Sequence, residues 1–369
     1  MGGELTWSCS GANTYEFQLI FYRDCNGAEV NVISEDLRVW NHPTLSAITL
    51  NFISRDDISP SCSVVVGSPP MLDCGSGSTA GNGLGAIERI TYRSSPITIE
   101  GTPPSNGWIF TYENFSRSNA LSNISNPSTF GITLAAKMYT NSNSVGNSCT
   151  DSSPIFLQSP HFVTCAGSEY RYNMNAIDPD LDSLLFQFGE PYDYFPTGSY
   201  NPPDNPSPVD FESGFSFSSP TPNTDLDPNN IVATIDPSTG EIVFTSYTIG
   251  NYNIKVTVQS YRNGDLIAEV EREMQVVVLP CSADNEAPII TAPFPGNVFE
   301  TTVNAGDLIN FDLLANDFDL LQDGNPQNVI ITASGPMFGT GYVNPTGCDI
   351  EPCATLNSLP PIQSPTTAT

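Results

Sequence analysis

The sequence predicts an all-β chain of tandem Ig-like or cadherin-like β-sandwich domains in an extended array. The 32 prolines and 28 glycines are dispersed, which is typical of short strands joined by turns. Many short segments alternate between apolar and polar residues, and no long segment has the 3.6-residue period of a helix. An acidic turn that recurs 139 residues later indicates a repeated module.

Residues 1–155 are predicted to form the first β-sandwich. The number and spacing of the alternating segments are typical of two packed antiparallel sheets. These segments are residues 15–22, 47–53, 87–92, 97–99, 108–112 and 132–139. The glycine-rich stretch after Cys74 lacks the lysine and the strand–helix context of a phosphate-binding loop, so we interpret it as a connecting loop.

Residues 156–283 are predicted to form a second sandwich with a long insertion at about 189–230. Loops of this length are uncommon unless they are functional or disordered. Aromatic residues in the insertion are candidates for stacking on sugar rings, although large aromatic residues more often pack their own loop onto the domain. The candidate glycan contacts are Tyr192, Tyr194 and Tyr200.

The acidic turn carries Asp178, Asp180 and Asp182 at alternate positions. A turn can bring three such carboxylates onto one calcium ion, which accepts six to eight oxygen ligands at flexible geometry. Without a cation the carboxylates would repel each other and raise one another's pKa. The alternative interpretation is an acidic turn exposed to solvent. We predict a structural calcium ion at this turn.

Residues 284–369 are predicted to be a second copy of the Ig-like module. Asp317 and Asp319 align with the first two carboxylates, and Leu321 replaces the third. Asp323 is the candidate substitute ligand. Counterparts of the closing strands at 236–279 would fall beyond the last residue, so we expect this copy to be truncated before its final strands.

Charge restricts the partners of the chain. Forty acidic residues oppose 11 basic residues, for a formal net charge of −29. Nucleic-acid binding requires cationic contacts with phosphates, so this class of function is excluded, and anionic membrane surfaces are disfavoured for the same reason. Self-repulsion on this scale opposes compaction, and bound divalent cations would relieve it. Adaptation to high salt is the alternative explanation of the acidity. No apolar run is long enough to span a membrane.

The nine cysteines indicate disulfides and an oxidising compartment, because none forms a CxxC pair and only two histidines are present. We favour pairing between neighbours in the sequence, although connectivity cannot be deduced from sequence. The favoured pairs are Cys9–Cys25, Cys62–Cys74 and Cys149–Cys165.

Enzymatic activity is not expected. His42 and His161 each adjoin a proline and have no evident triad partners. No nucleophile elbow and no metal-binding histidine pair occurs. The acidic pair Asp56-Asp57 resembles a glycosidase dyad only in composition, because that chemistry depends on the separation of the carboxylates in space.

Several short motifs occur in a characteristic order, at residues 2–7, 22–25, 107–110, 176–184 and 236–240, followed by Arg272. In these motifs the chain resembles the large SprB-like surface adhesins of gliding Bacteroidetes, over most of residues 1–340. Leu181 stands where such repeats usually have glycine. Glu271 and Glu273 flank Arg272 where the family pattern implies an Arg-Asp pair.

The resemblance implies a secreted protein, exported by a type IX secretion system and displayed on the outer membrane at the cell surface. It implies cell adhesion or gliding motility, with a surface polysaccharide or other cell-surface ligand, and with the secretion and gliding machinery, as partners. The alternative is a carbohydrate-binding region of a secreted polysaccharide-processing protein.

Overall fold

The computed structural model describes residues 2–59, 73–75, 81, 83, 85–115, 117–140, 151–160, 162–195, 200–202, 205–280, 289–299, 301–302, 309–316 and 354–358. The elements in this part of the chain are strands and one 3₁₀ turn at Pro127–Thr129, which confirms the all-β prediction. The chain divides into two compact units, Met1–Pro280 and Cys281–Thr369. This division falls three residues before the boundary expected at 283.

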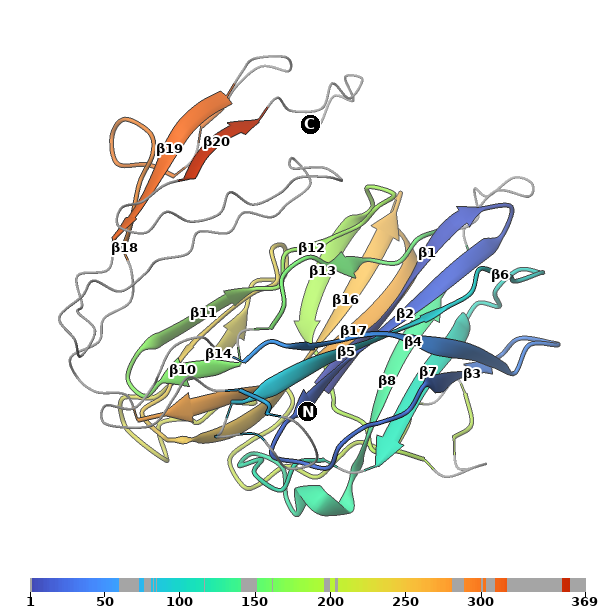
Figure 1. The fold of residues 1–369 in the computed structure, drawn as a ribbon, viewed down its shortest axis with the longest axis horizontal. Helices are drawn as coiled ribbons and strands as arrows, with labels where there is room; N and C mark the ends of the chain where they lie inside the picture. The colour runs from blue at the N-terminus through green and yellow to red at the C-terminus, as the bar shows by residue number, and fades with distance from the viewer. Residues whose placement is uncertain are drawn as a thin grey trace. The chain divides into compact units, whose positions relative to one another are not determined.

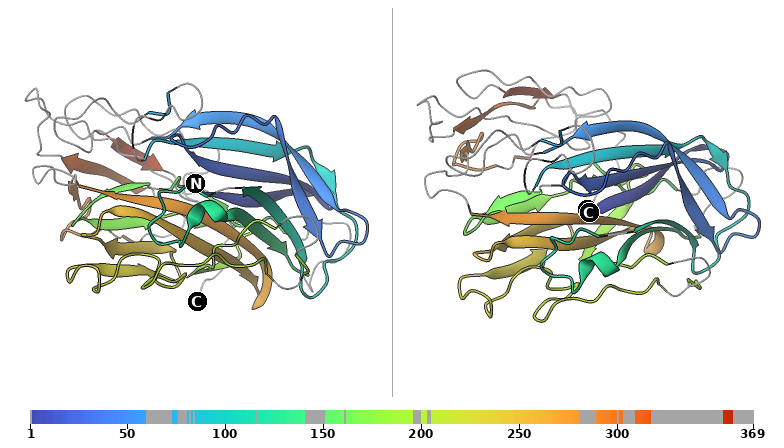
Figure 2. Two further views of the ribbon diagram at one scale, coloured as in Figure 1. Left: turned by 90° about the horizontal axis from the view of Figure 1, so that it is seen from below. Right: turned by 60° about the horizontal axis from the view of Figure 1, so that its bottom comes forward.

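Eight antiparallel strands of the first unit form a closed hydrogen-bonded circuit, which we call the closed sheet (Figure 1). Figure 2 shows the same strands from two other directions. In order around the circuit they are β1 (Gly2–Gly11), β2 (Thr14–Asp24), β5 (Ile87–Ser94), β4 (Ala47–Asp57), β3 (Ser34–Trp40), β7 (Trp108–Phe115), β8 (Gly131–Met138) and β17 (Asp265–Leu279), which returns to β1.

The closed sheet corrects the expected domain boundary at residue 155. Seven of its strands come from residues 1–155, but the eighth, β17, lies in the region assigned to the second domain. Strands β1 and β8 each form backbone hydrogen bonds with β17. This pairing is favourable because a strand edge without a partner leaves its backbone groups unpaired. Both regions therefore belong to one unit with a shared sheet, in place of the first two members of an Ig-like array.

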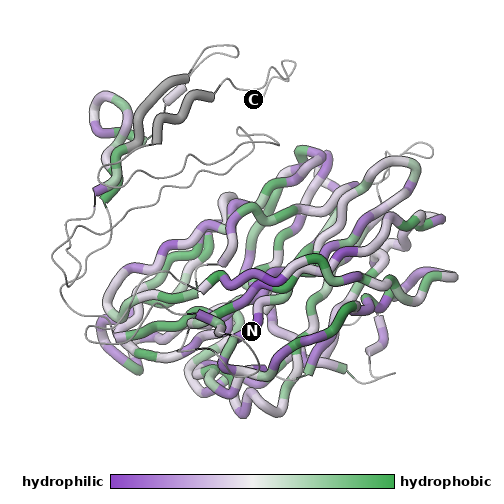
Figure 3. The backbone as a smooth tube through the Cα atoms, viewed as in Figure 1, coloured by the Kyte–Doolittle hydropathy of each residue, from purple (hydrophilic) through white to green (hydrophobic). Residues whose placement is uncertain are grey.

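The interior of the closed sheet is filled by aromatic side chains. The alternation noted in the sequence at 15–22 is reproduced in β2, where Phe17 and Phe21 are fully buried. Hydrophobic and hydrophilic residues alternate along the strands in Figure 3. The ring centroids of Phe17 and Phe110 are 4.6 Å apart, and those of Trp7 and Phe110 are 6.1 Å apart. This packing supplies the core predicted from the apolar positions.

Strand β17 joins the two halves of the unit. Along one edge it pairs with β16 (Gly250–Arg262), whose other edge pairs with β13 (Ser183–Phe188). Its opposite edge is shared by β8, β1 and the parallel strand β10 (Val163–Cys165). The closed sheet is therefore joined to β16, β13 and β10 through the hydrogen bonds of β17.

A smaller three-stranded sheet completes the unit. It has the order β11 (Glu169–Asn173), β15 (Glu241–Thr245) and β14 (Ile231–Ile235). Its apolar residues belong to the same hydrophobic core as those of the larger sheet. The aromatic rings of Tyr170 and Phe244 stack at 4.7 Å. The pair β9 (Ile155–Phe156) and β12 (Ala176–Ile177) leads into the acidic turn.

One face of β17 buries an ion pair between Arg272 and Glu4 of β1, with side chains 1% and 4% exposed. The Arg272 guanidinium also donates to the Tyr172 hydroxyl and to the Gln158 carbonyl, each at 2.6 Å. Its carbon lies 4.1 Å from the centroid of the Phe156 ring. Arg272 and Glu4 belong to the last and the first of the motifs on which the resemblance rests, and they form an ion pair with each other.

The other face of β17 buries two more carboxylates, because neighbouring residues of a strand point to opposite faces. Glu271 pairs with Lys255 at 2.9 Å and accepts a hydrogen bond from the Ala135 amide at 2.8 Å. Glu273 pairs with Arg117 and accepts from Asn253 Nδ2 at 2.8 Å. The glutamates that flank Arg272 thus have their own cationic partners.

The long insertion covers this second face. The Lys255 ammonium lies 3.7 Å from the centroid of the Tyr192 ring, and Arg117 Nη2 donates to the Tyr192 carbonyl at 2.9 Å. Burial raises the pKa of the Glu271 carboxyl and lowers the pKa of the Lys255 ammonium. The insertion therefore contacts both cations that pair with the carboxylates of this face.

The opening glycines fit the junction between β1 and β17. A Cβ atom on Gly2 would lie 2.1 Å from the Glu273 carbonyl oxygen, and one on Gly3 would lie 2.7 Å from both Ile20 O and Leu134 Cδ1. Backbone atoms that form sheet hydrogen bonds cannot move away by this amount. The Gly-Gly sequence is therefore required for β1 to approach its neighbours.

In the second unit, β18 (Ile289–Thr291), β19 (Ile309–Asn316) and β20 (Ala354–Ser358) form an antiparallel sheet. Asp317, Asp319 and Asp323, the predicted ligands of the second acidic turn, lie outside the described residues. Their metal site remains a prediction.

Replacing the buried arginine should leave Glu4 as an uncompensated buried charge. We expect Arg272→Met to lower the free energy of unfolding by about 3–5 kcal/mol, measured by urea denaturation. The matched control is Arg171→Met, because Arg171 forms ion pairs with Glu169 and Glu241 but is 53% exposed, and its loss should have a much smaller effect. Equal effects of the two substitutions would contradict the central role of the buried pair.

Candidate metal centre

The acidic turn connects β12 to β13 and has the geometry of an Asx turn. Asp178 Oδ1 accepts a hydrogen bond from the Asp180 amide at 2.8 Å, and the Asp178 carbonyl accepts from the Leu181 amide at 3.1 Å. Leu181 has φ of 66° and is 74% exposed. This left-handed conformation explains why glycine would suit the position better than leucine.

A fourth carboxylate, Asp151, joins the turn from a distant segment. Asp151, Asp178 and Asp180 each offer an oxygen, and these atoms lie within 4.8 Å of one another. The Ser152 amide donates to Asp180 Oδ2 at 2.6 Å, which fixes the segment to the turn. The same segment is held to β1, because Trp7 Nε1 donates to the Asp151 carbonyl at 3.1 Å.

Two oxygens in this cluster are buried without a hydrogen-bond partner. They are Asp151 Oδ2 and Asp178 Oδ2, on residues that are 1% and 6% exposed. A buried unpaired carboxylate oxygen is costly, and buried charges in proteins are normally paired or coordinate a metal. These two oxygens are therefore the strongest indication of a cation ligand in the described part of the chain.

Asp182 has a different role from the one predicted. Its two oxygens accept from Arg262 Nε at 2.7 Å and Nη2 at 2.6 Å. Arg262 Nη2 also contacts Asp151 Oδ1 at 2.7 Å. The predicted ligands Asp178 and Asp180 are brought together, whereas Asp182 is occupied by a guanidinium and Asp151 takes its place in the cluster.

The electrostatics of the cluster favour a neutralising partner beyond Arg262. Burial, followed by repulsion from Asp178, raises the pKa of Asp151 to about 9, despite the opposing effect of Arg262. Burial also raises the pKa of Asp178 to about 6, against the hydrogen bond from the Asp180 amide. Without a metal, Asp151 would therefore carry a proton at neutral pH.

The arrangement can hold either a proton or a divalent cation. Its oxygen donors suit calcium, which accepts carboxylates and waters at variable geometry, better than magnesium, which requires near-ideal octahedral geometry. Asp151, Asp178 and Asp180 would be the protein ligands. The bound ion would supply no reaction step here, only charge neutralisation and a cross-link between the 151–153 segment and the turn.

No signal in the sequence pointed to Asp151. It lies 27 residues before Asp178, at the end of an Asn- and Ser-rich stretch that reads as a linker. Its place in the cluster depends on the hydrogen bonds of its neighbours Ser152 and Ser153. Ser153 Oγ accepts from the Trp7 amide at 2.9 Å, a contact between residues 146 positions apart.

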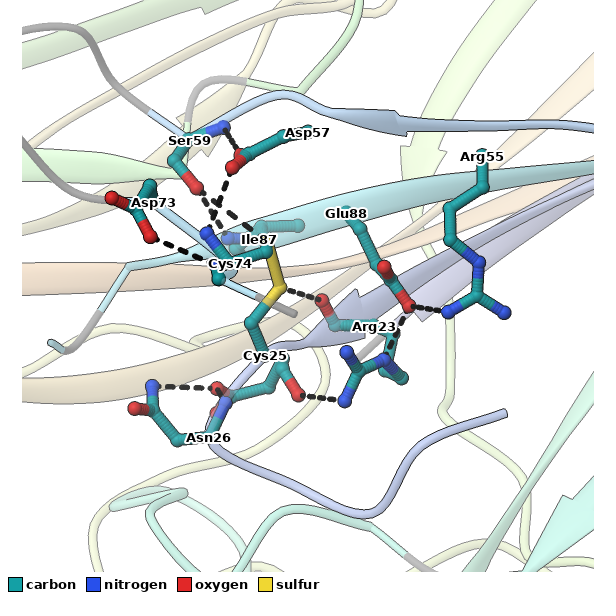
Figure 4. Close-up of a disulfide and its surroundings, with 12 residues drawn as sticks. Arg23, Cys25, Asn26, Arg55, Asp57, Ser59, Asp73, Cys74, Ile87 and Glu88 are labelled. Carbon is teal, nitrogen blue, oxygen red and sulfur yellow. Dashed lines mark hydrogen bonds and ion pairs between the residues drawn. A yellow bond between two sulfur atoms is a disulfide. The ribbon is translucent and has the colours of Figure 1, made fainter. Parts of the chain in front are cut away.

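Cys25 and Cys74 form a disulfide with an S–S distance of 2.02 Å (Figure 4). The predicted pairs Cys9–Cys25 and Cys62–Cys74 are therefore wrong, because folding brings the end of β2 beside a residue 49 positions away. Cys9 and Cys165 are also disulfide-bonded. Cys149 lies outside the described residues, so the Cys149–Cys165 pair remains a prediction.

Polar residues surround this disulfide. The Cys74 amide donates to Asp57 Oδ2 at 2.8 Å, and Glu88 Oε1 accepts from Arg23 and Arg55 (Figure 4). Although Cys25, Cys74 and Glu88 are close enough for a metal, the two sulfurs are bonded to each other. This cluster is a structural cross-link.

Two of the three predicted glycan contacts are buried. Tyr192 and Tyr200 are 7% and 6% exposed, and Tyr200 packs against Trp40 with centroids 5.0 Å apart. The prediction for these two residues is wrong, because the Tyr200 ring packs on Trp40 of the closed sheet and the Tyr192 ring packs on Lys255 of β16. Tyr194 is half-buried and lies edge-to-face with Phe115 at 5.3 Å.

The residues considered for catalysis have structural partners. His42 Nε2 lies 3.0 Å from the Glu100 carbonyl, and its ring packs on Trp108 at 4.8 Å. Asp56 pairs with Arg89 at 3.0 Å. His161 lies outside the described residues.

Comparisons with family models, with curated proteins and with solved structures found no match for this chain. No helix in the described residues is long and apolar enough to cross a membrane.

Glycine at position 181 should relieve the backbone strain of a leucine that is held in the left-handed conformation. We expect Leu181→Gly to stabilise the protein by up to about 1 kcal/mol, because the strain of the left-handed backbone exceeds the added flexibility of the unfolded chain. The matched control is Leu185→Gly, an exposed leucine in strand β13, which should destabilise. Urea denaturation of both variants measures the two effects, and a stability loss at 181 would contradict the strain argument.

The stability of the metal-free protein should fall as pH rises. The folded-state pKa of Asp151 is raised, so its contribution is fully present at low pH and is lost as pH rises towards about 9. In chelator, the Tm of the wild type relative to Asp151→Asn should therefore decrease from about pH 5 to about pH 9. A pH-independent difference between the two proteins would contradict this assignment.

Proposed function

We propose that this chain is a calcium-stabilised, disulfide-linked part of a secreted cell-surface adhesin that supports attachment or gliding motility. The observation that carries the proposal is the pair of buried, unpartnered oxygens on Asp151 and Asp178. A calcium ion that binds both would tie the 151–153 segment, and through it β1, to the turn that enters β13. The cation acts as a structural cross-link, and the chain performs no chemistry.

Two features support an extracellular setting. The Cys25–Cys74 disulfide is typical of oxidising compartments. The net charge of −29 is relieved by divalent cations, which are abundant outside cells. Export by a type IX system, a role in gliding and display on the outer membrane rest on the resemblance of the motifs alone. The second unit is proposed to repeat an Ig-like module that carries its own acidic turn.

Calcium dependence of stability tests the structural part of this proposal. At a calcium concentration about 100 times Kd, binding to the folded state adds about 2.7 kcal/mol. This corresponds to a rise of several degrees in Tm over the chelator-treated protein. Magnesium should have a smaller effect.

Two substitutions distinguish calcium binding at the acidic cluster from a nonspecific effect of calcium on the net negative charge. Asp178→Asn should abolish most of the calcium-induced rise in Tm, whereas Asp225→Asn, an exposed aspartate in the insertion, should retain it. Attachment of beads coated with the full chain to polysaccharide surfaces, with calcium or chelator, tests the adhesive role. A Tm insensitive to calcium would refute the cation cross-link, and beads that never attach would refute adhesion.

A further inference from the structure

A cavity of about 1340 Å³ opens where β2 ends, β3 begins and β7 ends. Its walls are the connection 26–32, the start of β3, the end of β7, the segment 117–120 and residues 194–195 of the insertion. It shares no residue with the acidic cluster. The volume exceeds the roughly 300–1,000 Å³ of typical small-molecule sites, so it can accommodate a short chain of several rings.

An exposed aromatic side chain forms part of the wall. Phe115 is 58% exposed, and its ring is held edge-to-face by Tyr194 at 5.3 Å. Phe195, which also lines the cavity, is buried, and the centroid of its ring lies 5.4 Å from the Arg38 guanidinium carbon. A large aromatic face left open to solvent beside polar groups is suited to stack on the apolar face of a sugar ring.

Hydrogen-bonding groups line the same cavity. Glu113 Oε1 lies 3.0 Å from Arg38 Nε, and Glu35 Oε1 accepts from the Tyr112 hydroxyl at 3.4 Å. Burial raises the pKa of Glu113 to about 7, against the effect of Arg38, and burial also raises the pKa of Glu35. Near neutral pH the Glu113 carboxyl can therefore both donate and accept hydrogen bonds, and the hydroxyl groups of a sugar need partners of both kinds.

The charge of the cavity selects among saccharides. Five acidic residues line it: Asp24, Glu29, Glu35, Asp36 and Glu113. Two of the three arginines that line the cavity form buried ion pairs, Arg23 with Glu88 and Arg117 with Glu273. Arg38 alone remains beside the opening, and it already pairs with Glu113. A polyanionic glycan would be repelled by this surface.

We propose that this cavity binds a short saccharide that carries no negative charge. Phe115 stacks on a sugar ring, while Glu35, Glu113 and Arg38 bind its hydroxyl groups. This proposal rests on the proposed role as a surface adhesin and names the class of ligand that the adhesin would bind. Because the cation site is separate, failure of saccharide binding would leave the calcium result intact, and the reverse also holds.

The test is calorimetric titration of the full chain with three oligosaccharides of equal length. They are a neutral glucan oligomer, an amine-bearing chitosan oligomer and a uronate oligomer. We expect at least one of the first two to bind and the uronate not to bind. The proposal is overturned if neither of the first two binds, or if the uronate binds as tightly as they do.

Phe115→Ala should weaken the binding about fivefold to tenfold, because the variant loses the aromatic ring that stacks on the sugar. Phe217→Ala is the matched control, since Phe217 is also exposed, at 42%, but does not line the cavity. Circular dichroism shows whether both variants fold. Unchanged affinity in Phe115→Ala, or an equal loss in Phe217→Ala, would place the saccharide elsewhere and refute the assignment.

Discussion

The buried ion pairs of β17 are the constraint on which the rest of the first unit depends. Three consecutive residues, Glu271 to Glu273, carry charge on both faces of one strand and are almost fully buried. A buried charge is tolerated only when it is paired and hydrogen-bonded. Each face must therefore be covered by groups that supply partners, which β1 and Tyr172 do on one side and Arg117 and Lys255 on the other.

This requirement gives the long insertion a structural role as well as a place in the proposed binding surface. Its Tyr192 covers Lys255 through the ring and Arg117 through the carbonyl, while its Tyr194 supports Phe115 at the cavity. Two tyrosines of one segment therefore contact the buried charges and the cavity wall, respectively. The segment that covers the β17 charges thus also forms part of the cavity wall.

The negative charge of the acidic cluster can be neutralised in three ways: by an arginine, by a proton and by a metal cation. Arg262 pairs with Asp182 and contacts Asp151, a proton can occupy Asp151, and the remaining buried oxygens suit a cation. The arginine takes the ligand that sequence spacing favoured, so the proposed calcium ion must draw on a segment far away in the chain. Such a ligand set, unlike three carboxylates of one turn, makes cation binding a cross-link between distant parts of the fold.

Local patterns by themselves determined the all-β class, the alternation of β2 and the turn that places Asp178 beside Asp180, because these depend on neighbours in the chain. The tertiary structure alone decided that β17 closes the sheet, that Cys25 pairs with Cys74, that Arg262 takes Asp182 and that Asp151 enters the cluster. These contacts join residues from 27 to 270 positions apart. Spacing along a sequence carries no information on which distant segments a shared core will bring together.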